Sequence, residues 1–127
     1  MKKALLPPLA VLAAVFSFAL WNSSAMETHT TRWQGQLHQA ETLAERGDWA
    51  GAESALRTSY DDWSQHQTYL HVVLEHAAVD DAEAMYRRAA AFAESQEPNE
   101  FQAEIADLSD QLGLLAEMEK FSVQNVL

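Results

Sequence analysis

The sequence predicts an all-α protein in which an N-terminal transmembrane anchor helix precedes a small bundle of three to four antiparallel helices. Residues 4–21 form one uncharged, largely apolar run. After residue 25, apolar residues recur at helical steps of three and four, and glycine and proline are rare. No stretch alternates apolar and polar residues for long enough to form a half-buried strand.

The run at residues 4–21 has the length of a membrane-spanning helix. As a helix it rises about 27 Å, close to the ~30 Å hydrocarbon core of a bilayer. Lys2 and Lys3 precede the run and favour a cytoplasmic N-terminus, while Trp21 suits the far interface. We therefore expect residues 1–25 to be a single-pass anchor in the cell membrane, and residues 26–127 to form an extracytoplasmic domain.

A secretory signal peptide is the alternative for the same residues. Two leading lysines, an apolar stretch and the small residues Ser23, Ser24 and Ala25 also describe a signal cleaved after Ala25. The run is, however, longer than the 7–15 residues typical of the apolar part of a signal peptide. The chain has no cysteine, so it contains neither a lipobox nor a disulfide framework.

The first two predicted helices form a hairpin. The first runs from about residue 27 to residue 46, and Gly47 and Asp48 are its expected C′ residue and the N-cap of the second. Small residues near this turn resemble those of a tetratricopeptide hairpin, but no second break follows at the repeat spacing. The apolar positions of the two helices are Trp33, Leu37, Ala40, Ala44, Trp49, Ala52, Leu56, Tyr60 and Trp63.

Two further helical segments follow. The third begins near Thr68 and either continues straight through residues 79–83 or restarts there with Asp80 as its cap. Pro98 ends it, and Asn99 is the expected cap of the last helix. The apolar positions of the third segment are Leu70, Val73, Leu74, Ala77, Ala78, Ala82, Met85, Ala89 and Phe92. Those of the last helix, the most regular stripe, are Phe101, Ile105, Leu108, Leu112 and Leu115.

The predicted domain at residues 26–127 is strongly acidic. It holds all 19 acidic residues and six of the eight basic ones, for a formal net charge of −13. Nucleic acids and anionic lipid headgroups bind proteins through neutralised phosphates, so this surface repels both. We therefore expect no nucleic-acid partner. The acidity is interpreted as keeping an alanine-rich helical domain soluble, with a cationic partner as the alternative.

The only cluster with the chemistry of a metal site lies at residues 71–83. On a helix, His71 and Glu75 share one face, and a second face carries His76, Asp80 and Glu83. Imidazoles with carboxylates one turn away can bind zinc or a similar divalent ion. The spacing is not the His-Glu-x-x-His motif of zinc proteases. The structural interpretation, which we prefer, is that Asp80 and Glu83 cap a helix and His76 hydrogen-bonds the adjoining turn.

The rest of the chain offers little catalytic chemistry. It contains no glycine-rich phosphate loop, no serine elbow and no cysteine nucleophile, and His29, His38 and His66 are expected to be solvated. We therefore predict no enzyme, no catalytic residue and no cofactor. The expected function is a non-catalytic interaction or structural accessory at the cell envelope, with a protein partner. The alternative is a metal-dependent sensor or enzyme centred on His76, Asp80 and Glu83.

Several stretches resemble a family of short, membrane-anchored bacterial proteins, domain of unknown function family 4363. The resemblance extends from Gly47 to the end of the chain and also fits the N-terminal apolar run. It is strongest at Trp63, at residues 75–83 (EHAAVDDAE), at residues 104–108 (EIADL) and at residues 119–127 (EKFSVQNVL). The resemblance implies an uncleaved anchor. Because the family has no established activity, it implies no catalytic residue.

Overall fold

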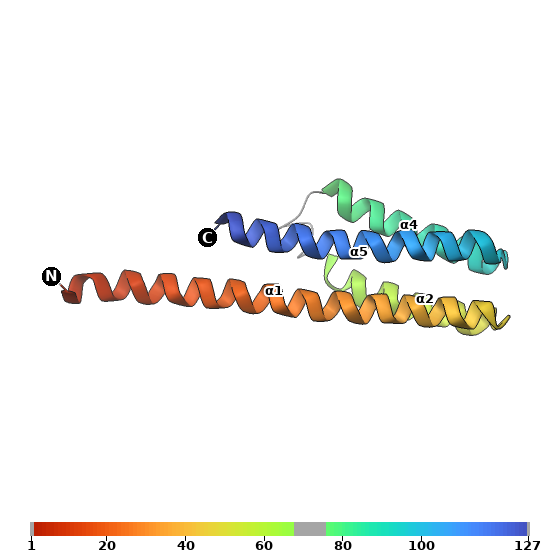
Figure 1. Cartoon of the computed structure of the whole chain (residues 1–127), viewed down its shortest axis with the longest axis horizontal. Helices are drawn as coiled ribbons and strands as arrows, with labels where there is room; N and C mark the ends of the chain where they lie inside the picture. The colour runs from red at the N-terminus through yellow and green to blue at the C-terminus, as the bar shows by residue number, and fades with distance from the viewer. Residues whose placement is uncertain (1, 68–75, 127) are drawn as a thin grey trace.

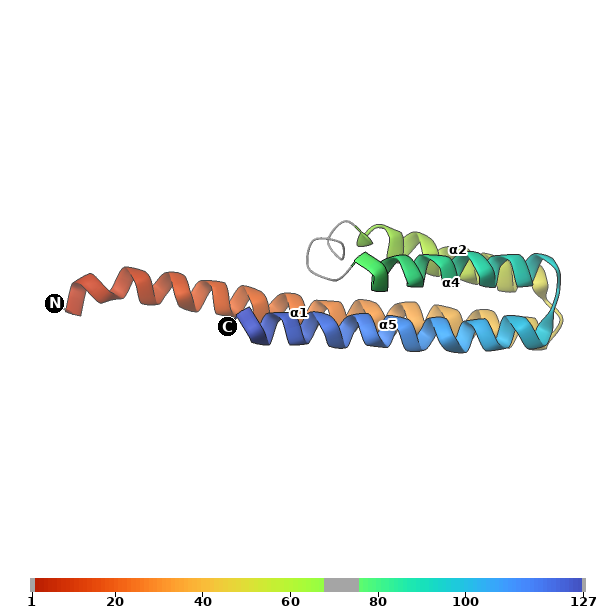
Figure 2. The ribbon, with the colours of Figure 1, turned by 90° about the horizontal axis from the view of Figure 1, so that it is seen from above.

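The computed structural model describes residues 2–67 and 76–126, without the side chains at 2–6, 19–20, 22–27 and 122–126. The described residues form helices and no strand, which confirms the all-α prediction. The helices are α1 (Lys2–Glu45), α2 (Trp49–Ser64), α4 (His76–Glu94) and α5 (Pro98–Val126). They alternate in direction, as the colours of Figures 1 and 2 show. Each helix packs against two others, α1 and α4 both lying between α2 and α5, so the predicted antiparallel bundle is a four-helix bundle.

Helix α1 is one continuous helix of 44 residues, about 66 Å long. The sequence predicted an anchor at residues 1–25 and a separate helix from residue 27, and this division of the helix is wrong. Residues 22–27 contain neither glycine nor proline, so nothing in the local sequence ends the helix there. The N-terminal half of α1 projects well past the bundle, whereas its C-terminal half packs against α2 and α5 (Figures 1 and 2).

The projecting part of α1 carries large apolar side chains in contact with solvent. Within the described residues, no helix is both long and apolar enough to cross a membrane. Residues 4–6 and 19–20 of the predicted anchor are among those whose side chains are not described. The large apolar side chains of the remainder are 46–67% exposed: Leu9, Val11, Leu12, Val15, Phe16, Phe18 and Trp21.

The turn between α1 and α2 has the predicted geometry. Gly47 adopts a φ of 80°, the left-handed conformation expected of a C′ glycine. The Asp48 carboxylate accepts a hydrogen bond from the backbone N–H of Gly51 at 2.9 Å, so Asp48 is the N-cap of α2. These two residues therefore position α2 antiparallel to α1.

The core contains the predicted stripes of three helices. Those of α1, α2 and α5 are confirmed, apart from Trp49 and Tyr60, which are only half-buried. Trp49 still packs edge-on against Phe101, with ring centroids 5.5 Å apart. The buried apolar side chains are Trp33, Leu37, Ala40, Ala44, Ala52, Leu56, Trp63, Phe101, Ile105, Leu108, Leu112, Leu115 and Ala116 on these helices.

Helix α4 is rotated relative to the prediction. Its buried residues are Val79, Ala82, Tyr86, Ala89 and Ala93, whereas Ala78, Met85 and Phe92 lie half-buried at the edge. Both sets follow helical steps of three and four and share Ala82 and Ala89, so spacing alone does not distinguish them. The difference places Tyr86, which the sequence analysis did not assign to the core, among its largest buried side chains.

Two predicted helix starts are wrong. Helix α4 runs without interruption through residues 79–83, so Asp80 and Glu83 lie inside it and do not cap it. Helix α5 begins at Pro98 and not after an Asn99 cap, because proline at the first helical position lacks only an N–H that has no partner within the helix. The predicted start of the third segment at Thr68, with Leu70, Val73 and Leu74, lies outside the described residues.

Candidate functional site

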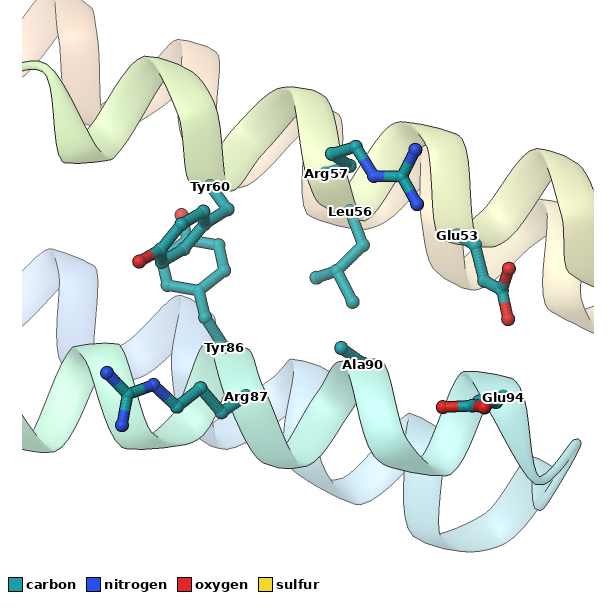
Figure 3. Close-up of a pocket in the computed structure, with 8 residues that line it drawn as sticks. All are labelled: Glu53, Leu56, Arg57, Tyr60, Tyr86, Arg87, Ala90 and Glu94. Carbon is teal, nitrogen blue, oxygen red and sulfur yellow. The ribbon is translucent and has the colours of Figure 1, made fainter.

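A groove of about 590 Å³ lies between α2 and α4. Helix α2 contributes residues three and four positions apart, which share one face of the helix. Helix α4 contributes Ala90, whose short side chain leaves space opposite Leu56 (Figure 3). The residues that line the groove are Glu53, Leu56, Arg57, Tyr60, Tyr86, Arg87, Ala90 and Glu94.

The groove has an apolar floor and charged edges of both signs. Leu56 is buried at its centre, and the carboxylates of Glu53 and Glu94 lie near one end (Figure 3). Arg57 and Arg87 are exposed cations in an otherwise acidic domain. The lining residues include no cysteine, histidine, serine or threonine. This arrangement provides a binding surface with apolar and charged contacts, and none of its side chains pairs a nucleophile with a base.

Two tyrosines close the other end of the groove. The rings of Tyr60 and Tyr86 pack edge to face with centroids 5.4 Å apart. The Tyr86 hydroxyl and the Ser59 Oγ are 2.8 Å apart, and Ser59 donates to the carbonyl of Trp33 at 3.3 Å. Because Ser59 has one proton, Tyr86 is the donor to Ser59. Burial raises the pKa of Tyr86 far above its ordinary range, so its hydroxyl stays protonated in this network.

Glu83 joins α2 to α4 beside these tyrosines. Its carboxylate accepts hydrogen bonds from the Tyr60 hydroxyl at 3.1 Å, the Gln67 side-chain amide at 2.9 Å and Arg87 at 2.9 Å. Partial burial opposes ionisation, but these three hydrogen bonds outweigh it and lower the pKa of Glu83. Glu83 is therefore an ionised bridge that holds the end of α2 against α4.

The predicted metal cluster does not assemble among the described residues. His76 and Asp80 are exposed on α4, while the Glu83 carboxylate is directed toward Tyr60, Gln67 and Arg87. No group of three histidine or acidic side chains in the described part of the chain has an arrangement that could hold a metal ion. His71 and Glu75 lie outside the described residues. The proposed centre at His76, Asp80 and Glu83 therefore has no structural support.

A histidine pair that the sequence analysis missed lies where α2 ends beside α1. His29 and His66, predicted to be solvated, are half-buried with ring centroids 4.4 Å apart. Trp33 lies 5.9 Å from the His29 ring and 5.4 Å from the His66 ring. Burial, and to a smaller extent His66 and Arg32, lower the pKa of His29. The four-residue spacing of His29 and Trp33 was the one sequence signal of this cluster, because His66 is distant in the chain.

Asp62 connects the same cluster to α1. Its carboxylate accepts a hydrogen bond from the Gln36 side-chain amide at 2.8 Å and forms an ion pair with Arg32 at 3.5 Å. The Nδ1 atom of His66 lies 3.0 Å from the Asp62 carbonyl oxygen. Of the other predicted solvated histidines, His38 is exposed as expected.

The comparisons with known proteins identify one family. The model of the family described as domain of unknown function DUF4363 matches residues 20–126. No curated protein and no solved structure matches the chain. The family match covers all four bundle helices, including the groove and the histidine pair, and it begins next to Trp21. The chain therefore belongs to the DUF4363 family.

Proposed function

We propose that this protein is a non-catalytic interaction or structural accessory of the cell envelope, anchored in the cell membrane by residues 4–21. Its N-terminus is cytoplasmic, and its acidic four-helix bundle is displayed outside the cytoplasm. The observation that carries this proposal is the projecting part of α1, where seven large apolar side chains are 46–67% exposed. A bilayer would remove this surface from water at a gain of roughly 25 cal/mol per Å².

The arrangement of these side chains supports insertion into lipid. They occupy positions 9, 11, 12, 15, 16, 18 and 21, which are distributed around the whole circumference of α1. An amphipathic helix would instead show one apolar stripe and one polar face. Lys2 and Lys3 stand at the outer end of the segment, in the position that favours retention in the cytoplasm.

The groove between α2 and α4 supports the interaction part of the proposal. It is open along its length and combines the buried Leu56 with the exposed Arg57 and Arg87. A photo-crosslinking residue at Ala90, inside the groove, should capture a partner in intact cells. The same residue at Ala106, exposed on the outer face of α5, is the matched control. Equal labelling from both positions would argue against the groove as the contact surface.

Membrane fractionation tests the anchor. Full-length protein should remain in the membrane through high-salt and carbonate washes, because hydrophobic insertion is not screened by salt. A Val11→Arg substitution, near the middle of the run, should cost about 2.5–3.5 kcal/mol of insertion free energy and shift protein to the soluble fraction. Gln39→Arg is the control, since Gln39 is exposed on the bundle part of the same helix.

Two results would contradict the anchor. One is release of the wild-type protein by salt alone. The other is a mature protein that begins at Met26, which would identify residues 1–25 as a cleaved signal peptide.

A further inference from the structure

We propose that the C-terminal end of α5 is a second contact with the lipid bilayer, made where α1 enters it, so that Phe121 and Trp21 lie together at the membrane interface. This inference rests on the proposed anchoring by residues 4–21. It concerns a different helix, however, and a residue that no argument for the anchor uses.

The register between α1 and α5 carries the inference. The side-chain amide of Gln34 on α1 donates to the backbone carbonyl of Ser109 on α5 at 2.9 Å, which fixes the two antiparallel helices relative to each other. Phe121 lies twelve residues beyond Ser109, and residue 22 lies twelve residues before Gln34. Both helices are continuous over these stretches, so Phe121 is level with the residue next to Trp21. Figure 2 shows the end of α5 beside this part of α1.

The side chains at this level have the chemistry of a membrane interface. Trp21 is 67% exposed and Phe121 is 65% exposed, although both belong to the least water-soluble residue types. Aromatic rings gather at the boundary between headgroups and acyl chains, because one part of that region is apolar and the other is wet. An isolated exposed aromatic residue needs no explanation, but two at one height on neighbouring helices form a common surface.

The distribution of charge agrees with a boundary at the same height. Beyond Phe121 the remaining residues of α5 are uncharged, and from Trp21 back to residue 4 so are those of α1. On the other side of this level lies a domain with a formal net charge of −13, which anionic headgroups repel. Only the uncharged end of the bundle can therefore approach the bilayer without an electrostatic penalty.

Site-directed labelling of the full chain tests this inference. The protein has no cysteine, so single cysteines at Phe121, Leu114 and Val15 can each carry an environment-sensitive fluorophore. Leu114 is the matched control: it is exposed on the same helix, one side of two turns away, about 10 Å farther from the proposed interface. Val15 reports on the anchor itself. The labelled proteins are reconstituted into phosphatidylcholine vesicles and probed with aqueous iodide and with spin-labelled lipids.

The expected result is a blue-shifted label at Phe121 that is quenched several-fold less by iodide than the label at Leu114, and more by lipids spin-labelled near the headgroup. Labels at Phe121 and Leu114 that behave alike, while Val15 is protected by lipid, would overturn the inference and leave the anchor standing. If the label at Val15 is quenched by iodide as strongly as that at Leu114, both the anchor and the inference fail.

Discussion

His29 is the side chain whose ionisation the fold changes most clearly at the end of the bundle next to the projecting helix. Its ring stacks on Trp33 and lies against His66, so protonating it would place a cation in a partly buried site beside a second titratable ring. Asp62 acts in the opposite direction, but burial and the neighbouring cationic groups outweigh it, and the pKa of His29 falls below its ordinary value of 6.5.

This lowered pKa makes the stability of the bundle depend on pH. The unfolded chain binds a proton at His29 near pH 6.5, whereas the folded chain resists it, so the unfolded state binds more protons as the pH falls. We expect the melting temperature of the full-length protein in detergent to drop between about pH 7.5 and about pH 5.5. His29→Gln should reduce this drop, as followed by circular dichroism.

His38→Gln is the control for this pH dependence, since His38 is exposed on the same helix. It should leave the profile of the parent unchanged. Glu83 also has a lowered pKa, from its ordinary value of 4.5, and its contribution is lost only at lower pH, outside this window. A profile that His29→Gln does not alter would contradict the role assigned to His29.

At the scale of single helices, α5 contributes the most regular apolar stripe of the bundle. Leu108 lies at its centre and is 0% exposed, with Ile105 and Leu112 one turn to either side. Leu108→Ala should therefore lower the free energy of unfolding by about 2–5 kcal/mol, through lost burial and the cavity left behind. Chemical denaturation of the full-length protein in detergent measures this change.

Leu114→Ala is the matched substitution on the same helix. Leu114 is 50% exposed, so its truncation should change the free energy of unfolding by no more than about 0.5 kcal/mol. Equal destabilisation by the two substitutions would mean that the face of α5 assigned to the core is wrong.

Helix α4 shows where helical periodicity stops being informative. The predicted stripe through Met85 and Phe92 and the observed stripe through Tyr86 and Ala93 differ by a small rotation about the helix axis. The observed rotation is the one that buries the Tyr86 ring while its hydroxyl bonds Ser59 on α2. It also leaves Ala90 facing the groove, so the partner helix determines both the core face and the binding surface of α4.

At the scale of the whole molecule, α1 is a single element with two environments. Its N-terminal part exposes large apolar side chains, and its C-terminal part buries Trp33, Leu37 and Ala40 in the bundle. Because the helix is continuous, an inserted N-terminal part would set the orientation of the bundle on the membrane. The proposed contact at Phe121 would add a second point of attachment and restrict tilting of the bundle about α1.

The sequence by itself determined the features that depend on a few neighbouring residues. Helical periodicity identified the core faces of α1, α2 and α5, and Gly47 and Asp48 determined the first turn through a left-handed glycine and an N-cap. The uncharged run at residues 4–21 was equally evident from composition alone. These signals act within one or two helical turns, so no tertiary information is needed to read them.

The tertiary structure alone decided which distant residues meet. It brought His29 to His66, turned Glu83 toward Tyr60 and away from a metal site, opened the groove between α2 and α4, and set Phe121 level with Trp21. Each of these depends on the pairing, rotation and register of helices. Packing across the whole bundle fixes those quantities, and residue spacing within one helix is compatible with several values of each.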